Sequence, residues 1–221
     1  GVGALGTAAA PGLASFLWAL EATAGWALWP RAWALGAALW LAYLAFGVCL
    51  MALAVAVTRL LPPLAPGVYA FASPQGARWF FGGVLAFLVS KLFLDFLLLT
   101  GVNVWYFRLM GARIGRGVQI NTKEISDFHL VEIGDGAMVG GRATVIGHVG
   151  ERGKLRLDRV KIGARATVGL GAVLFPGVDV GEGAVVGAGA VVPKGTVVAP
   201  GSVVVGAPAR AVNAKDGKGT G

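Results

Sequence analysis

The chain has 221 residues, of which 56% are apolar and only 14% are charged, and its formal net charge is +8. An average soluble domain holds about 45–50% apolar and about 25% charged residues. This composition therefore excludes an ordinary soluble globular protein and favours membrane spans or an unusual apolar core. The single cysteine excludes an internal disulfide and a Cys-x-x-Cys metal site.

The basic residues lie mostly from Arg108 onward. They form no stripe interleaved with aromatic residues, which is the pattern of a nucleic-acid-binding face. We therefore expect no nucleic acid as a partner. Membrane lipid with anionic headgroups, or a phosphate-rich cofactor, fits this charge better.

The strongest membrane signal is a run of 26 residues without charge, residues 32–57, which Arg31 and Arg59 flank. About 20 apolar residues cross a bilayer core, so this run predicts a transmembrane helix. Residues 80–105 form a second candidate, interrupted by Lys91 and Asp95. These two residues are four apart, so they would share one helix face and could pair there.

A weaker third candidate covers residues 12–29, with Glu21 in its middle and tryptophans along it. Residues 60–79 contain proline and glycine and read as a loop. We therefore predict a membrane domain over residues 1–110 with two to three transmembrane helices. The arginines that follow the last helix place the rest of the chain in the cytoplasm by the positive-inside rule, as part of a multi-pass membrane protein.

The second half of the chain repeats with a period of six. The aliphatic residues of this repeat are Ile162, Val168, Leu174, Val180, Val186, Val192, Val198 and Val204. A fixed period marks a solenoid, and a period of six is that of a parallel β-helix, here predicted over residues 111–210. One aliphatic side chain per hexad points inward and stacks on the next coil, while small residues occupy the tight corners. Residues 211–221 are polar and glycine-rich and are predicted to be a flexible tail.

Two interruptions break this period. Ile120 and Ile133 are thirteen apart, and Val145 and Ile162 are seventeen apart, so residues 121–132 and the segment around 147–160 do not fit the hexads. Insertions in a solenoid emerge as loops, often on the binding face. The two histidines of the chain, His129 and His148, lie in these two segments.

The repeats carry a family resemblance. The stretches VEIGDGAMVGGRATVIGH and VKIGARATVGLGAVLFPGVDVGEGAVVGAGAVVPKGTVVAPGSVVVGAPAR cover about residues 131–210 and resemble the hexapeptide-repeat acyltransferase superfamily. The resemblance implies a mainly β fold, a left-handed parallel β-helix that here follows transmembrane α-helices. It also implies transfer of an acyl group from acetyl-CoA or another acyl-CoA to a hydroxyl or amine, no metal, and a homotrimer.

A second resemblance covers about residues 78–170. The stretch NVWYFRLMGARIGRGVQINTKEISDFHLVEIGD, directly after an apolar segment, resembles the membrane-embedded terminal regions of nonribosomal peptide synthetases of the poly-lysine-synthetase type. Those regions pair transmembrane helices with acyltransferase-like β-helix halves, and this chain contains one such half.

The superfamily resemblance assigns His148 as the catalytic base. Catalytic histidines of the family follow an incomplete hexad and precede an inserted loop, as His148 does. Imidazole suits proton transfer near neutral pH. A solvated loop histidine is the alternative. A carboxylate would orient the imidazole, and the sequence leaves the candidates open: Glu132, Asp127, Glu151 and Asp158.

The same resemblance implies residues for the two substrates. Asn121 aligns with an asparagine that holds the acceptor in some sugar acetyltransferases, and His129 and Asp127, in the same insertion, are expected to line the acceptor site. Residues at hexad corners are expected to bind the CoA arm: Leu170, Gly187, Ala188, Pro193, Lys194 and Arg210. Lys194 and Arg210 carry the positive charge that phosphates need, whereas Pro193 stands where the family often has a hydroxyl residue.

Two alternatives remain to be weighed. A γ-type carbonic anhydrase shares the fold but needs three histidines on one zinc, and the chain has two. A non-catalytic β-helix, acting as a scaffold or an accessory module of a membrane peptide synthetase, is the serious rival. The two readings differ in whether His148 faces a groove together with a base-orienting group. For the enzyme, a sugar, an envelope glycan or a peptide is the expected acyl acceptor.

Overall fold

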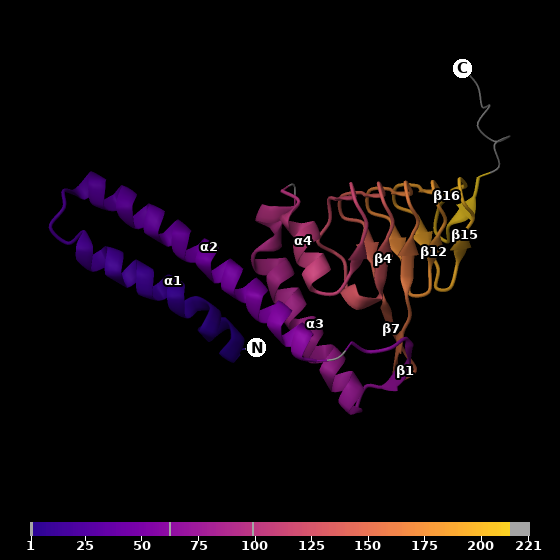
Figure 1. Cartoon of the computed structure of the whole chain (residues 1–221), viewed down its shortest axis with the longest axis horizontal. Helices are drawn as coiled ribbons and strands as arrows, with labels where there is room; N and C mark the ends of the chain where they lie inside the picture. The colour runs from indigo at the N-terminus through magenta and orange to yellow at the C-terminus, as the bar shows by residue number, and fades with distance from the viewer. Residues whose placement is uncertain (1, 62, 99, 213–221) are drawn as a thin grey trace, which may run out of the picture.

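The computed structural model of the chain describes residues 2–61, 63–98 and 100–212. The first half is helical and the second half is a solenoid of short strands (Figure 1). The helical half contains α1 (Val2–Ala22), α2 (Leu28–Leu60), α3 (Pro74–Leu92), the 3-10 helix η1 (Leu94–Leu97) and α4 (Val102–Leu109), with the strand β1 (Gly67–Ala70) between α2 and α3.

Helices α1 and α2 form an antiparallel hairpin that slants away from the solenoid (Figure 1). The two helices approach closely at Gly12, where an added Cβ would lie 2.6 Å from the Ala42 carbonyl oxygen. Small residues permit such close helix pairs, which are common inside membranes. Of the helices in the described ranges, one, α2, is long and apolar enough to span a membrane. The prediction of two to three such helices is therefore wrong in its number.

The segment predicted as one helix over 80–105 is divided. Helix α3 ends at Leu92, Asp95 lies in η1, and α4 begins only at Val102. Helix α3 also begins earlier than expected, within the segment read as a loop, because Ser73 caps it by accepting a hydrogen bond from the Gly76 amide at 3.1 Å. A serine cap followed by proline at the first helical position is a strong start signal, which the glycine and proline content of 60–79 concealed.

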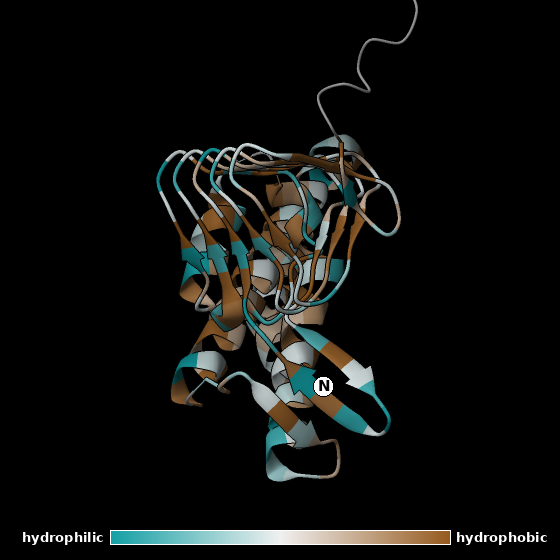
Figure 2. Ribbon diagram, turned by 90° about the vertical axis from the view of Figure 1, so that its right-hand side faces the viewer, coloured by the Kyte–Doolittle hydropathy of each residue, from teal (hydrophilic) through white to brown (hydrophobic). Residues whose placement is uncertain are grey.

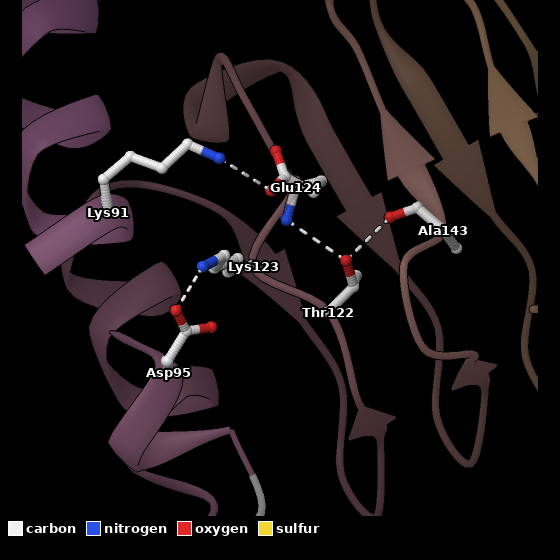
Figure 3. A network of polar contacts seen from close by, with 6 residues as sticks. All are labelled: Lys91, Asp95, Thr122, Lys123, Glu124 and Ala143. Atoms are coloured by element: carbon white, nitrogen blue, oxygen red, sulfur yellow. Dashed lines mark hydrogen bonds and ion pairs between the residues drawn. The ribbon is translucent and has the colours of Figure 1, made fainter. Parts of the chain in front are cut away.

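Lys91 and Asp95 do not pair with each other (Figure 3). Lys91 Nζ lies 3.1 Å from a carboxylate oxygen of Glu124, and Asp95 pairs with Lys123. The predicted pairing required one continuous helix, and the break after Leu92 turns Asp95 away from that face. Lys91 and Asp95 instead both contact the first insertion of the solenoid.

The coils of the solenoid stack their strands into parallel sheets, and the last strand, β17 (Arg210–Ala211), runs antiparallel to its neighbour. Val168 pairs with Val186 and Val186 pairs with Val204, so partners are 18 residues apart and three hexads complete a coil. This register establishes a parallel β-helix. The inward aliphatic side chains are buried, and glycines such as Gly183 and Gly189 hold the corners with φ of 65° and 66°, a backbone conformation that side chains disfavour.

The strands of the solenoid fall into three sheets. The five-stranded sheet holds β2 (Arg113–Ile114), β4 (Val131–Ile133), β9 (Val160–Ile162), β12 (Asp179–Val180) and β15 (Val197–Val198). The six-stranded sheet holds β3 (Gln119–Ile120), β5 (Met138–Val139), β10 (Thr167–Val168), β13 (Val185–Val186), β16 (Val203–Val205) and β17 (Arg210–Ala211). The three-stranded parallel sheet holds β6 (Thr144–Val145), β11 (Val173–Leu174) and β14 (Val191–Val192).

Both interruptions of the repeat are ordered. In the first, Ile125 makes a parallel bridge with Val145, and the 3-10 helix η2 (Phe128–Leu130) follows. The second is a hairpin, β7 (His148–Glu151) and β8 (Lys154–Leu157), to which β1 adds a third antiparallel strand. This small sheet lies below the coils when the solenoid is viewed from its C-terminal end (Figure 2).

The helical half closes the open end of the solenoid. Asn103 of α4, which is 1% exposed, donates from its side-chain amide to the Ile120 carbonyl at 2.7 Å. Phe107 of α4 stacks on Phe128 with ring centroids 5.2 Å apart. A solenoid needs such a cap because its terminal coil has no neighbour to cover it. At the other end, Ala211 belongs to β17, and residues 213–221 of the predicted tail lie outside the described residues.

Candidate active site

His148 and Asp127 form a hydrogen-bonded pair where the two insertions meet. His148 Nδ1 lies 2.6 Å from Asp127 Oδ2. A carboxylate accepts hydrogen bonds, so Nδ1 carries the proton in this contact and Nε2 keeps a free lone pair. The His148 side chain is 30% exposed and that of Asp127 only 5%. The pair can therefore take up a proton on Nε2 while the buried carboxylate stabilises the resulting imidazolium.

Asp127 is held by further donors. Trp79 of α3 donates from Nε1 to Oδ1 at 2.8 Å, and Ser126 Oγ donates to Oδ2 at 3.1 Å. The Trp79 and His148 rings also meet edge to face, 4.7 Å between centroids. Burial by itself would raise the pKa of Asp127, but the hydrogen bond and charge of His148, with the Trp79 and Ser126 donors, outweigh it and hold the pKa below its ordinary value.

The local backbone explains how these residues meet. Asp127 precedes η2 in the left-handed region, with φ 52° and ψ 48°, which a short polar side chain tolerates. Gly147, directly before His148, packs so closely on Asp127 that an added Cβ would lie 2.8 Å from the Asp127 Cβ. A glycine at 147 thus lets the second insertion approach the first within hydrogen-bonding distance.

The structure distinguishes among the four carboxylates that could orient His148. Glu132 pairs with Arg113 at 2.8 Å and with Arg159 at 3.1 Å. Glu151 pairs with Lys194, and Asp158 lies 3.5 Å from Arg156. Only Asp127 among the four contacts the imidazole in the part of the chain described here.

A cavity of about 540 Å³ opens on the histidine. Its walls come from the end of α2, the following linker, α3 and the first insertion, and His148, Asp127 and His129 all line it. Small-molecule sites have volumes of about 300–1,000 Å³, so this cavity is large enough for a substrate. The base therefore faces a partly open cavity between the helical half and the solenoid.

His129 lies in this cavity and not on the solvated surface. Burial lowers its pKa; the Asp127 charge and a backbone hydrogen bond with Leu64 act in the opposite direction, and the Arg78 charge lowers it further. Its Nε2 is buried and makes no hydrogen bond within the described residues. His129 therefore holds a buried ring nitrogen beside the cavity that has no protein partner among the described residues.

The other predicted site residues lie at two different corners of the solenoid. Leu170, Gly187 and Ala188 follow strands of the six-stranded sheet, and Gly189 donates to the Leu170 carbonyl at 2.8 Å. Asn121 follows β3 of the same sheet, so it stands at this same corner, exposed, with its carbonyl close to Gly141.

Pro193 and Lys194 follow β14, at the corner where His148 follows β6. Lys194 pairs there with Glu151 of the hairpin. Arg210 lies in β17, paired with Val205 near the last coil. One chain therefore does not bring the six predicted cofactor residues into one groove.

Sequence reasoning missed Trp79 and Ser126. Ser126 is next to Asp127 in the sequence, but no motif marks it as a site residue. Trp79 lies 48 residues before Asp127 in a segment read as a loop, so no local signal linked it to the site. Among the described residues, no group of three histidine, cysteine, aspartate or glutamate side chains gathers as a metal site would require.

Comparisons with known proteins agree on the architecture. A family model described as the hexapeptide repeat of succinyl-transferase matches residues 159–194. No curated protein sequence matches the chain significantly. Among solved structures, the maltose O-acetyltransferase from Clostridium difficile 630 superposes with a TM-score of 0.50 at 18% identity, covering 66% of this chain and 91% of that one.

A galactoside acetyltransferase in complex with coenzyme A also has a TM-score of 0.50, at 16% identity, covering 67% of this chain and 86% of that one. At such identities the similarity concerns the fold. The repeat model and the two superpositions together support a hexapeptide-repeat fold for the solenoid.

Proposed function

We propose that this protein is a membrane-bound acyltransferase that moves an acyl group from acyl-CoA to a hydroxyl or amine of a sugar, glycan or peptide, with His148 as the general base. The observation that carries the proposal is the Asp127-oriented imidazole that opens on a cavity of substrate size. The two structural matches are acetyltransferases named for maltose and galactosides, which supports a sugar hydroxyl as the acceptor group.

The chemistry follows from the orientation of the ring. Nε2 of His148 accepts the proton of the acceptor hydroxyl while that oxygen attacks the thioester carbonyl. The carbon–sulfur bond then breaks, and the imidazolium returns the proton to the departing CoA thiolate. Asp127 stays ionised throughout and stabilises the imidazolium, because hydrogen bonds to its carboxylate hold its pKa low against the effect of burial.

For acyl-CoA, the predicted contacts remain part of the proposal. The corner of Leu170 and Ala188 and the corner of Pro193 and Lys194 belong to different edges of the solenoid. In a homotrimer, one subunit's first corner would face its neighbour's second corner, so a CoA arm could use both. Lys194 would have to exchange its Glu151 partner for a phosphate.

Membrane attachment rests on α2. Its 33 residues are about 50 Å long, more than the roughly 30 Å of a bilayer core. In the proposed arrangement, α2 crosses the membrane, α1 packs on it, and the solenoid lies in the cytoplasm at the C-terminal end of α2. The resemblance to the terminal regions of peptide synthetases remains a prediction.

The test is thiol release from acetyl-CoA by protein in lipid nanodiscs, with a panel of sugar, glycan and peptide acceptors. We expect acceptor-dependent release that falls by about 100-fold or more in His148→Ala. His148→Asn is the matched variant, because its amide can still donate to Asp127 but cannot act as a base. Calorimetric binding of CoA to each variant reports whether the site is intact.

Two outcomes would contradict the proposal. Full activity in both variants would remove His148 from the reaction. Failure to bind CoA and to release thiol with any acceptor would favour the non-catalytic scaffold.

A further inference from the structure

Helix α3 contacts the first insertion of the solenoid at two points, and the cavity lies between these two contacts. Trp79 contacts Asp127 near the start of the helix, and Lys91 contacts Glu124 near its end. These residues are 12 apart (91 − 79), which corresponds to about 18 Å along a helix. Gly82 and Gly83 lie between the two contacts and line the cavity. The absence of side chains there leaves room between α3 and the first insertion.

The side of this cavity that α2 and α3 form is mainly apolar, whereas the first insertion contributes polar side chains such as Lys123 and Glu124. Val57 of α2, Leu61 directly after α2 and Val84 of α3 line the cavity. Phe80 and Phe87 also line it, yet each is 59% exposed, and their spacing of seven puts them on one face of α3. Large exposed aromatic side chains at a rim indicate an apolar neighbour. The cavity thus extends from the catalytic histidine toward the helices that we place in the membrane.

Polar groups gather at the inner end. His148 and Asp127 are there, with the buried Nε2 of His129 and with Arg78, which is near enough to His129 to lower its pKa. Within the described residues the lining ends at His148, so the later coils with the predicted cofactor residues lie outside the cavity. The nucleophile that gives its proton to His148 would therefore come from the cavity, and the thioester from the other side.

We propose that this cavity binds the apolar chain of an amphiphilic acyl acceptor, so that the acceptor's hydroxyl or amine reaches His148. The chain lies between α3 and the first insertion, and the headgroup lies among His148, His129 and Arg78. This inference rests on the proposed function and specifies the substrate class of the same site. Such an acceptor would enter laterally from the membrane, past Phe80 and Phe87.

A homologous series of acceptors tests the proposal. With acetyl-CoA as donor, the protein in lipid nanodiscs is assayed with methyl, hexyl, octyl and dodecyl β-glucoside. The KM for the acceptor should fall by about tenfold or more from methyl to octyl, because each buried methylene adds affinity. A parallel series of acetyl-, octanoyl- and lauroyl-CoA with methyl glucoside asks whether the acyl chain uses the cavity instead.

The variants exploit the two glycines. An added Cβ at Gly82 or Gly83 meets nothing within 4 Å, so Gly83→Leu fills the cavity without a backbone clash, and leucine favours the helix more than glycine does. Gly36→Leu is the matched control, since Gly36 is an equally open position of α2 that does not line the cavity. Gly83→Leu should abolish the dependence of KM on alkyl length, and Gly36→Leu should preserve it.

The outcomes separate the two proposals. A KM that does not depend on alkyl length, or a chain-length preference confined to the acyl-CoA series, would overturn the acceptor cavity. If no glucoside is acetylated, a diazirine-bearing octyl glucoside still decides whether the cavity binds such a chain. Photolabelling of residues 123–148 in wild type and Gly36→Leu, but not in Gly83→Leu, would support the cavity even though the proposed reaction had failed. Equal labelling in all three would refute it.

Discussion

Asp127 is the residue on which the site depends. It is a buried carboxylate that receives hydrogen bonds from its neighbour Ser126 and from two distant residues, Trp79 and His148. Each of these hydrogen bonds favours the ionised form over the neutral acid. An aspartate whose hydrogen bonds favour its ionised form fixes the tautomer and the direction of the neighbouring imidazole ring, which are the properties that a general base needs.

Asp127→Asn should reduce kcat/KM by about 100-fold or more while the protein still folds and binds CoA. An amide can donate to Nδ1, which would move the imidazole proton to Nε2 and block the basic position. Asp158→Asn is the control, because Asp158 is also a carboxylate near the second insertion but pairs with Arg156. Kinetics of both variants with one acceptor provide the measurement, and equal activity of both would show that Asp127 does not orient the base.

His129 should make the protein less stable in mild acid. Burial lowers its folded-state pKa below the ordinary 6.5, so the unfolded chain binds more protons as pH falls below that value. The stability contributed by neutral His129 is present above about pH 6.5, the ordinary pKa of histidine, and is lost as the pH decreases through the folded-state pKa. Between pH 7.5 and 5, the Tm of wild type should therefore fall more than that of His129→Gln. Parallel Tm curves for the two proteins would contradict the assignment.

At the level of elements, α3 is part of the catalytic site although it belongs to the helical half. Trp79 reaches across to the first insertion and contacts both members of the His148–Asp127 pair. The solenoid alone supplies the base and the carboxylate but lacks this donor. The Nε1 hydrogen bond of Trp79 should therefore affect activity through Asp127.

A double-mutant cycle tests this coupling. Trp79→Phe keeps an aromatic edge near His148 but removes the Nε1 donor, so kcat should fall by about tenfold, in the range of a hydrogen bond to a charged group. In the Asp127→Asn background, the same change should have almost no further effect. Rate constants for the wild type, the two single variants and the double variant complete the cycle. Additive losses would mean that Trp79 acts on the site by another route.

The elements differ in how far the sequence could predict them. The hexads from Ile162 to Val204 repeat locally, so the aliphatic period predicted the strands and the three-hexad coil. The breaks of that period also marked both insertions. The two insertions approach each other at Gly147, and this contact depends on how successive coils stack, so no local sequence pattern predicts it. The Ser73–Pro74 cap could have located the start of α3, but the contact from Trp79 to Asp127 is a tertiary one.

At the scale of the whole molecule, the C-terminal end of α2 packs on the end of α4, the helix that leads into the solenoid. Arg59 Nε donates to the Leu109 carbonyl at 3.1 Å, and Thr58 contacts the sulfur of Met110 at 3.7 Å. The cavity lies at this same end, lined by Val57, Thr58 and Leu61. If α2 crosses the membrane, its C-terminal end places the catalytic histidine next to the bilayer surface, where an amphiphilic acceptor is concentrated.

This arrangement requires the turn between α1 and α2 to lie across the membrane from the solenoid. The chain's single cysteine, Cys49, lies within α2, so Cys49→Ala gives a background in which one new thiol reports its own side. Gly25→Cys places a thiol in the turn, where an added Cβ meets nothing within 4 Å, and Lys154→Cys places one on the exposed hairpin. In sealed inside-out vesicles, a membrane-impermeant maleimide should label Lys154→Cys at once and Gly25→Cys only after detergent is added. Labelling of both thiols before detergent would show that α2 does not cross the bilayer, and the cavity would then have to receive its acceptor from water rather than from lipid.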